Sequence, residues 1–264
     1  MLHGHWLKTL GIPGSYERVD VPLESVEAFF QSFHAQGFVG CNVTAPDKEA
    51  VLRAVTRLEP QAAMIGAVNT IWTENGSLVG GNTDVHGFIA NLDDRAPGWD
   101  ATAKAALLLG AGGATRAAIV ALRARGLSVT LANRTRANAE ALATHFNTLP
   151  GPKINVTDWS ALPDALAKTD LLVNATVLGM LGKPPLDIDL APLPATAIVT
   201  DIVYVPLETP LLRQARSRGL RTVDGLGMLL HQAVPGFARW FGVTPKVTPE
   251  LRHLLEQDIQ PKAA

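Results

Sequence analysis

The chain lacks the features of secreted, membrane-spanning and nucleic-acid-binding proteins. Its single cysteine, Cys41, cannot form an internal disulfide, which is typical of a reducing compartment. No apolar run reaches the ~18 residues of a membrane-spanning helix, and the N-terminus has neither the basic start nor the apolar stretch of a signal peptide. The 23 Lys and Arg residues against 24 Asp and Glu residues give a net charge of -1, whereas binding to phosphates calls for a basic surplus. We expect a cytoplasmic protein that binds neither membranes nor nucleic acids.

Enough apolar sequence is present for two domains. At 264 residues, 47% of them hydrophobic, the chain is long for one domain and short for three. Helical and extended patterns alternate in its first third, and Asn75-Gly76 between two β-type runs is a strong hairpin signal. This part predicts a small mixed α/β sheet. Its expected helices cover residues 2–10, 23–37 and 46–58, and its expected extended segments cover residues 15–21, 38–44, 67–73 and 77–83.

From about residue 101 the pattern changes to repeated strand and helix units. The strands are short continuous apolar runs, as in a parallel sheet that is covered on both faces. Such alternation predicts a doubly wound fold that binds its ligand at the carboxyl ends of the strands. A helical tail follows, which Pro235 should bend. The expected strands cover residues 105–109, 127–132, 153–157, 170–176, 197–204 and 220–224.

A glycine-rich turn joins the first of these strands to a helix. Its sequence is Gly110-Ala111-Gly112-Gly113-Ala114-Thr115, with Thr115 in place of the third glycine of G-x-G-x-x-G. Glycines there let the backbone approach a pyrophosphate, and the helix N-terminus supplies free N–H groups and partial positive charge. The flanking strand and helix, which such a motif requires as context, favour a dinucleotide site.

The end of the next strand indicates which dinucleotide is bound. An acidic residue about 20 positions after the turn normally holds the ribose hydroxyls of NAD. Here that place is occupied by Asn133-Arg134-Thr135. An arginine can bind a 2′-phosphate with two parallel hydrogen bonds. The sequence therefore predicts NADP rather than NAD.

Four polar residues of the first third could carry chemistry, and each also has an ordinary structural explanation. Lys48 could be a solvated lysine, and Thr44 could cap the helix that follows it. The run Asn82-Thr83-Asp84 could simply cap the next helix, and Asn69 could be a polar strand residue. A metal site is not expected, because no Cys or carboxylate cluster accompanies the histidines near the N-terminus.

Eight motifs follow one another along the chain: GCNVTAPDKEA, GAVNT, GGNTDVHGF, LGAGGATRA, NRT, NATVLGM, VYVPLETPLL and DGLGMLLHQA. Taken together and in this order, they resemble the shikimate dehydrogenase family over nearly the whole chain. That resemblance implies an N-terminal substrate domain (residues 1–84 with 226–264) facing an NADP-binding domain (residues 85–225). It also implies the interconversion of 3-dehydroshikimate and shikimate in aromatic amino-acid biosynthesis.

The same resemblance implies a role for individual residues. Lys48 and Asp84 would be the catalytic pair, in which Lys48 donates a proton to the ketone oxygen and Asp84 orients it. The implied substrate-binding residues are Thr44, Asn69, Asp84, Tyr204 and Gln232. The implied NADP-binding residues are Gly110, Gly112, Gly113, Ala114, Asn133, Arg134, Thr135, Thr176, Gly225 and Met228.

The chain departs from the family pattern at several positions. Asp47 stands where His is common, Val177 replaces the serine of NATS, and Val205 replaces the asparagine of VYNP. A second arginine after NRT is missing, because Asn138 falls at its spacing, and Arg136 could substitute for it.

The largest departure concerns the start of the family pattern. A leading strand and a Ser-x-Ser loop that grips the substrate carboxylate have no counterpart, since Met1 falls inside that motif. We expect a shortened version of a working enzyme, which binds NADP but turns over shikimate poorly. A quinate/shikimate dehydrogenase and a non-catalytic NADP-binding relative remain alternatives. The sequence leaves open whether the protein is a monomer or a homodimer.

Overall fold

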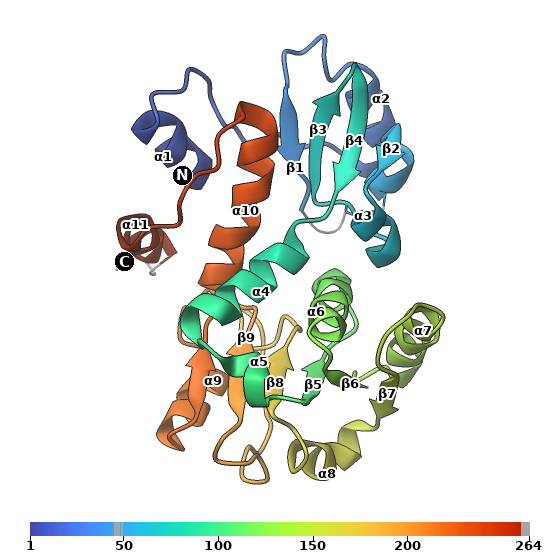
Figure 1. The fold of residues 1–264 in the computed structure, drawn as a ribbon, viewed down its shortest axis with the longest axis vertical. Coiled ribbons are helices and arrows are strands. Elements are labelled where there is room, and N and C mark those ends of the chain that lie inside the picture. Colours follow the sequence, from blue (N-terminus) through green and yellow to red (C-terminus); the bar gives the residue numbers. More distant parts are fainter. Residues whose placement is uncertain (45–47, 49, 260–264) are drawn as a thin grey trace. The chain divides into compact units, whose positions relative to one another are not determined.

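The computed structural model describes residues 1–44, 48 and 50–259, which form two compact units (Figure 1). The first unit comprises Met1–Gly87 and Leu230–Leu255, and the second comprises Phe88–Leu229 and the chain from Glu256. Three of the described helices pass from one unit's segments to the other's: α4 (Asp84–Arg95), α10 (Leu226–Phe241) and α11 (Pro249–Ile259). Pro46 and Asp47 lie outside the described residues.

A hairpin forms the centre of the sheet in the first unit. Strands β3 (Thr70–Glu74) and β4 (Ser77–Gly81) pair antiparallel, and Asn75 (φ 52°) and Gly76 (φ 76°) form the turn between them. Both turn residues have the positive φ that a two-residue hairpin loop requires, so the predicted hairpin is confirmed. Strands β1 (Gly40–Asn42) and β2 (Arg57–Leu58) complete the described sheet, in the order β1-β3-β4-β2.

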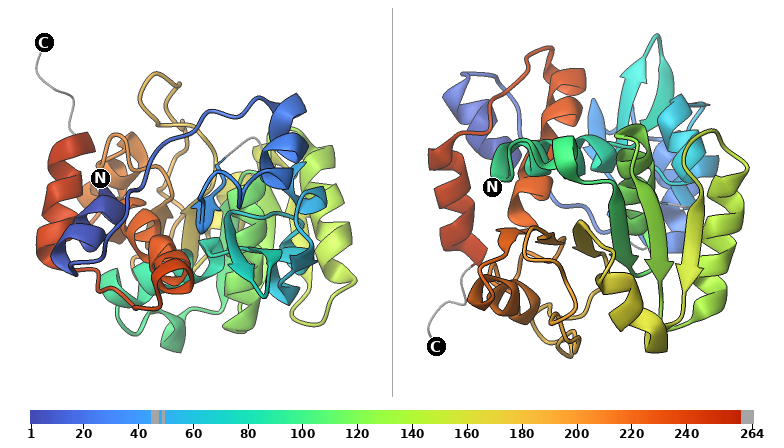
Figure 2. Two further views of the ribbon diagram at one scale, coloured as in Figure 1. Left: turned by 90° about the horizontal axis from the view of Figure 1, so that it is seen from above. Right: turned by 60° about the horizontal axis from the view of Figure 1, so that its bottom comes forward.

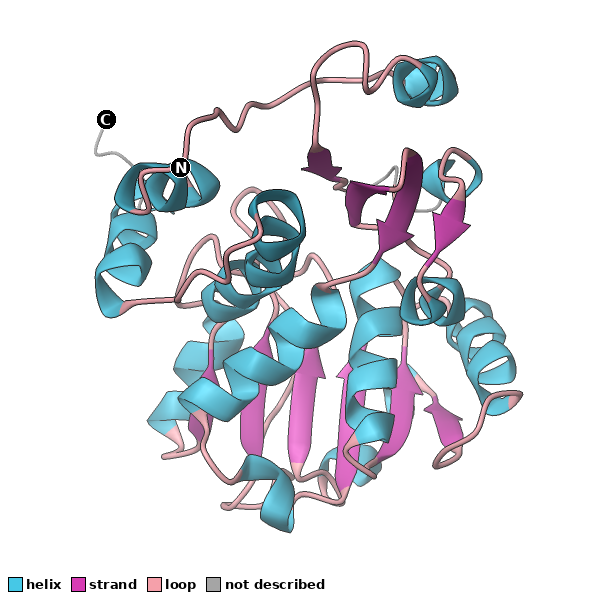
Figure 3. Ribbon diagram, turned by 45° about the horizontal axis from the view of Figure 1, so that its top comes forward, coloured by secondary structure: helices cyan, strands magenta, loops and turns pink. Residues whose placement is uncertain are grey.

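Helices precede, connect and follow the strands of this sheet along the chain (Figure 3). The predicted helix over residues 46–58 is wrong in its described part, where a short 3-10 helix and β2 are found instead. The helical elements are α1 (Leu2–Thr9), η1 (Leu23–Ser25), α2 (Val26–Gln31), η2 (Ala50–Arg53), α3 (Pro60–Ile65), most of α10, and α11 (Pro249–Ile259), which begins in this unit.

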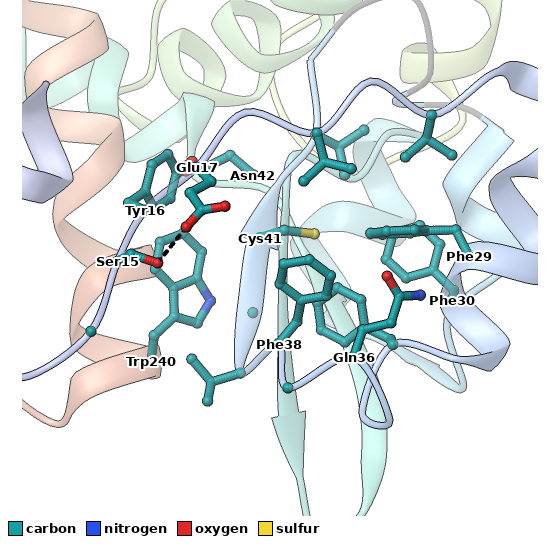
Figure 4. Close-up of a pocket in the computed structure, with 18 of the residues that line it drawn as sticks. Ser15, Tyr16, Glu17, Phe29, Phe30, Gln36, Phe38, Cys41, Asn42 and Trp240 are labelled. Carbon is teal, nitrogen blue, oxygen red and sulfur yellow. Dashed lines mark hydrogen bonds between the residues drawn. The ribbon is translucent and has the colours of Figure 1, made fainter.

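The outer edge of β1 borders a cavity of about 770 Å³ (Figure 4). Cys41 lies opposite Ile71 in β3, and the Val43 N–H donates to the Asn69 carbonyl at 2.8 Å. In an antiparallel pair, the backbone groups of successive residues point alternately toward the partner strand and away from it. The backbone groups of Gly40 and Asn42 therefore point to the edge away from β3. Residues 15–21 line the far wall of this cavity in part. They were predicted to be extended, and no regular strand is assigned to them.

The second unit contains a parallel six-stranded sheet among its described residues. The strand order is β10-β9-β8-β5-β6-β7, so the order reverses between the neighbours β5 and β8. All pairs in it are parallel, as predicted (Figure 2). The strands are β5 (Ala105–Leu109), β6 (Ser128–Ala132), β7 (Ile154–Thr157), β8 (Leu171–Asn174), β9 (Ile198–Asp201) and β10 (Arg221–Val223).

The central strands of this sheet are fully buried. Leu107, Leu108 and Leu109 in β5 have no exposed surface, which explains why the strand is a continuous apolar run. Helices lie between the strands along the chain and make the sheet doubly wound. They are α6 (Gly113–Ala124), α7 (Arg136–Asn147), η3 (Trp159–Ala161), α8 (Leu162–Leu166) and α9 (Pro210–Ser217), and the short α5 (Trp99–Thr102) precedes the first strand.

Among the described helices, none is long and apolar enough to cross a lipid bilayer.

Candidate active site

An ion pair joins Lys48 and Asp84 in the first unit. The Lys48 ammonium lies 2.6 Å from Asp84 Oδ2, with 21% of the lysine side chain and 7% of the aspartate side chain exposed. Asp84 is the first residue of α4, and the Lys48 carbonyl accepts the Val68 N–H at 2.9 Å. The two residues are 36 positions apart in sequence, so the fold brings together the pair predicted from the family pattern.

Asn69 connects this ion pair to a third part of the chain. Its amide nitrogen donates to Asp84 Oδ1 at 2.8 Å and to Gln232 Oε1 of α10 at 3.1 Å. Its side-chain oxygen accepts the Thr83 N–H and the Thr70 hydroxyl, each at 2.8 Å. Both oxygens of Asp84 are thus engaged, one by a cation and one by an amide. Four of the predicted residues form one hydrogen-bonded cluster.

The Asn82-Thr83-Asp84 turn holds the carboxylate end of the cluster. Asn82 Oδ1 accepts the Asp84 N–H at 2.9 Å, and its amide nitrogen donates to the Ala67 carbonyl at 3.0 Å. All three residues are at most 9% exposed. The alternative explanation of this segment as a helix cap is therefore also correct, because Asn82 caps the backbone that presents Asp84.

Thr44 lies apart from the cluster in the described contacts. It is exposed and, with Asn42, lines the cavity beside β1, whose described lining includes neither Lys48 nor Asp84. Asn42 was not predicted from the sequence. Its amide nitrogen donates to the Asn69 carbonyl and to the Thr70 hydroxyl, each at 3.3 Å, so it holds the chain where Asn69 leads into β3.

Two aromatic neighbours hold Asn42 from the other side. Its side-chain oxygen accepts the Tyr16 hydroxyl at 2.7 Å and lies 3.1 Å from His3 Nε2. Burial lowers the pKa of His3 to about 4, and burial raises the pKa of Tyr16 to about 12. Both side chains are therefore neutral at pH 7. Periodicity could not reveal this contact, since 39 and 26 positions separate the partners.

The glycine turn of the second unit lies at the point where the strand order reverses. Gly110 has φ 112° and approaches the Ala175 carbonyl so closely that an added Cβ would lie 2.9 Å from its oxygen. An added Cβ at Gly112 or Gly113 would meet nothing within 4 Å. Gly112 is the N-cap of α6, a 12-residue helix that continues through Ala114. Packing explains Gly110, whereas open backbone at a helix N-terminus fits a bound phosphate at Gly112 and Gly113.

Asn133, Arg134 and Thr135 follow β6, which pairs with β5. The Asn133 amide donates to the Thr135 carbonyl at 2.8 Å, which shapes the turn, and Arg134 is exposed. Arg136 lies in ion pairs with Glu140 (2.7 Å) and Asp158 (2.6 Å). The carboxylates already offset its charge, so Arg134 is the better of the two candidates for binding a 2′-phosphate.

Four further predicted residues follow the carboxyl ends of β8, β9 and β10. The Thr176 hydroxyl donates to Asn174 Oδ1 at 2.7 Å and accepts the Leu178 N–H at 3.0 Å. Tyr204 is half-buried in the segment after β9. Gly225 is buried after β10, and Met228 is half-buried in the first turns of α10. Crevices outside the carboxyl ends of parallel strands are the usual ligand sites of such sheets.

These residues fit NADP by their chemistry. The turn offers backbone N–H groups to a pyrophosphate, and Arg134 offers a guanidinium to a phosphate ester. Among the described residues, no group of three or more His, Cys, Asp or Glu side chains is arranged to hold a metal ion.

Comparisons with known proteins agree with this arrangement. The shikimate dehydrogenase substrate binding domain matches residues 1–71, shikimate / quinate 5-dehydrogenase matches residues 94–179, and the shikimate 5'-dehydrogenase C-terminal domain matches residues 225–249. A shikimate dehydrogenase (NADP(+)) of Azorhizobium caulinodans is 54% identical, covering 99% of this chain and 92% of the relative. One of Methylocella silvestris is 55% identical, covering 98% and 91%.

A solved structure shows the same likeness in three dimensions. Shikimate 5-dehydrogenase of Thermus thermophilus, in complex with NADP(H) and shikimate, matches with a TM-score of 0.83 at 35% identity. The match covers 98% of this chain and 93% of that one. The ordered motifs, the two units and these matches lead to one conclusion: the chain belongs to the shikimate dehydrogenase family.

Proposed function

We propose that the protein catalyses the reversible NADP-dependent reduction of 3-dehydroshikimate to shikimate. The observation that carries the proposal is the 2.6 Å ion pair of Lys48 and Asp84 within a buried cluster of amides, in a chain of this family. The relatives named above are NADP(+) shikimate dehydrogenases, so a preference for quinate is not favoured.

Lys48 supplies the proton chemistry. Reduction of a ketone adds a hydride to carbon and a proton to oxygen, and the Lys48 ammonium is the donor for that proton. Its charge also stabilises the negative charge that develops on the oxygen. In the reverse direction the same nitrogen takes the proton of the hydroxyl. Asp84 holds the ammonium in place and is itself held by Asn69, so the donor is oriented before substrate binds.

The substrate's hydroxyl groups are proposed to bind to Thr44, Asn69, Asp84, Tyr204 and Gln232. Asn69 and Gln232 are suited to this role because an amide both donates and accepts hydrogen bonds. Their mutual hydrogen bond, at 3.1 Å, fixes which end of each amide faces its partner. A substrate analogue that lacks one of these hydroxyl groups would leave a polar side chain of the site unpaired. Such a site therefore discriminates between substrates that differ in their hydroxyl groups.

The cofactor is proposed to bind at the carboxyl edge of the six-stranded sheet. Gly110, Gly112, Gly113 and Ala114 would hold the pyrophosphate, with Asn133, Arg134 and Thr135 at the 2′-phosphate. Thr176, Gly225 and Met228 would approach the nicotinamide. When bound, NADP supplies or accepts the hydride.

We also propose that the enzyme works in the cytoplasm, as a monomer or a homodimer. The lone cysteine supports the compartment, since it requires no oxidising surroundings.

An isosteric substitution tests the carrying observation. Asp84→Asn removes the carboxylate that pairs with Lys48 and should lower shikimate-dependent NADPH formation by ~10²-fold or more. Asp94→Asn, an exposed position of the same helix, is the matched control and should leave the rate unchanged. Equal rates for the two variants would contradict the proposal.

A further inference from the structure

Asp201 is a buried carboxylate that the proposed function leaves without a role. It ends β9 and has no exposed surface. Three groups donate to it: the Asn174 amide to Oδ1 at 2.9 Å, the Val203 N–H to Oδ1 at 3.0 Å, and the Thr209 hydroxyl to Oδ2 at 2.7 Å. All three donors are uncharged, so these contacts hold the carboxylate without an ion pair.

One of these donors organises the segment after β8. Asn174, the last residue of β8, also donates to the Leu178 carbonyl at 3.1 Å. Its side-chain oxygen accepts the Thr176 N–H at 3.1 Å and the Thr176 hydroxyl at 2.7 Å. Asn174 thus shapes residues 175–178, and its own orientation is set by Asp201.

The other two donors organise the segment after β9. Val203 and Thr209 stand at the two ends of a loop that contains Tyr204, and Thr209 also caps α9 by accepting the Leu212 N–H at 3.3 Å. The two loops meet directly, since the Leu181 N–H donates to the Val205 carbonyl at 2.8 Å. One carboxylate therefore holds both loops at neighbouring strand ends.

A third segment depends on the same loop. An added Cβ at Gly225 would collide with the carbonyl oxygen of Ile202, the residue after Asp201. The backbone at Gly225 thus lies directly against the loop that Asp201 fixes. A shift of that loop would be passed on to Gly225 by contact.

We propose that Asp201 is a positioning residue for both ligands, because its hydrogen bonds set the loops that carry Thr176 and Tyr204. This inference rests on the proposed function, which places the cofactor at Thr176 and Gly225 and the substrate at Tyr204. Burial raises the pKa of Asp201 to about 6, which is still below 7, so the carboxylate form predominates at pH 7 and accepts from all three donors. An amide in its place has only one acceptor oxygen.

The test compares Asp201→Asn with Asp170→Asn. Asp170 is the matched control because it accepts the backbone N–H groups of Lys104 and Ala105, at 2.8 and 3.0 Å, at the amino end of the same sheet. Dissociation constants for NADPH, by fluorescence, and for shikimate, by calorimetry, are measured beside KM and kcat. Asp201→Asn should weaken both ligands by ~10-fold or more, and Asp170→Asn should weaken neither.

A second pair of variants separates the loops. Thr209→Val releases the loop with Tyr204 and leaves the Asn174 contacts of the other loop in place. The KM for shikimate should therefore rise at least ~5-fold, with NADPH binding weakened less than in Asp201→Asn, and Thr209→Ser should restore the wild-type KM. The inference is overturned if Asp201→Asn and Thr209→Val lower only the unfolding temperature and leave both dissociation constants unchanged. If the wild type oxidises no shikimate, yet Asp201→Asn weakens NADPH binding, the proposed function and the substrate part of this inference fail, and its cofactor part stands.

Discussion

The two units build their proposed sites by different means. In the first unit the site consists of side chains from distant parts of the chain, Lys48, Asn69, Asp84 and Gln232, which meet in one cluster. In the second unit it consists largely of backbone, in the turn at Gly112 and Gly113 and in the loops after the strands. Chemistry needs particular functional groups, whereas binding a pyrophosphate needs N–H groups that any backbone can supply.

The two sheets differ in the same sense. Five parallel pairings join the strands of the second unit, and β5 and β8 in its centre have buried neighbours on both sides. The first unit has a mixed sheet in which β1 pairs with β3 alone among the described strands, and its other edge borders the cavity. Both sheets pack against buried apolar side chains, but only the second is parallel throughout its described strands.

The largest expected effect is on turnover and belongs to the first unit. Lys48→Ala removes the proposed proton donor and should lower kcat by about 10²–10⁴. Lys168→Ala, an exposed lysine of the second unit, should leave kcat unchanged. Steady-state assays of NADPH formation measure both rates. A fully active Lys48→Ala variant would contradict the proposal that the first unit supplies the proton donor.

Core truncation in each unit sharpens the comparison of the two sheets. Phe33 and Phe146 have no exposed surface, but Phe33 also lines the cavity beside β1. Phe→Ala substitutions in cores cost about 3–5 kcal/mol. We expect Phe146→Ala to lie at the upper end and Phe33→Ala at the lower end, because Phe33 already borders a cavity into which its neighbours can relax after truncation. Urea unfolding measures both free energies, and the reverse order would contradict this explanation.

A fall in pH should change the contributions of His3 in the first unit and Asp201 in the second to the free energy of unfolding in opposite directions. Burial lowers the pKa of His3 from 6.5 to about 4, so the unfolded chain binds its proton first and the stability that neutral His3 contributes is lost as the pH falls below 6.5. Burial raises the pKa of Asp201 from 3.8 to about 6, so its contribution is present at low pH and lost as the pH rises through 6. Each effect is at most about 3 kcal/mol.

Two substitutions isolate these contributions. Between pH 7 and pH 5, His3→Gln should reduce the fall in the free energy of unfolding, and Asp201→Asn should increase that fall. Chemical denaturation at both pH values provides the comparison. Identical pH dependence in wild type and variants would show that neither group titrates as its burial implies.

The smallest expected effect concerns the choice of cofactor. Arg134→Ala should weaken NADP binding by roughly 30-fold and leave NAD binding unchanged, because one charge-assisted contact to the 2′-phosphate is lost. Arg136→Ala is the matched control, since Glu140 and Asp158 already engage that side chain. Fluorescence titration with both cofactors gives the ratio, and an equal loss in the two variants would contradict the assignment to Arg134.

The second unit was the more predictable from sequence. All six of its strands coincide with predicted apolar runs, because a strand that is buried on both faces must be apolar throughout. The glycine turn was also recognised, because its signal lies in a few consecutive residues. Asp201 was missed, since one aspartate at a strand end looks alike whether it faces solvent or holds two loops.

The first unit was harder to predict because its structure depends on partners. The hairpin at Asn75-Gly76 was predicted correctly from its turn, which is a local signal. Residues 15–21 have an extended pattern, yet a strand forms only where a neighbour completes its hydrogen bonds. Asn42 was missed because its partners His3, Tyr16 and Asn69 are scattered along the chain. The cluster around Asp84 was expected only from the resemblance to a family.

A crossed binding measurement tests the central claim, that the first unit supplies the chemistry and the second holds the cofactor. NADPH and shikimate dissociation constants are determined for Lys48→Ala and for Arg134→Ala. We predict that Lys48→Ala binds NADPH as the wild type does but has lost turnover, and that Arg134→Ala binds shikimate normally but NADPH about 30-fold more weakly. Weakened NADPH binding in Lys48→Ala, together with full NADPH affinity in Arg134→Ala, would contradict the account.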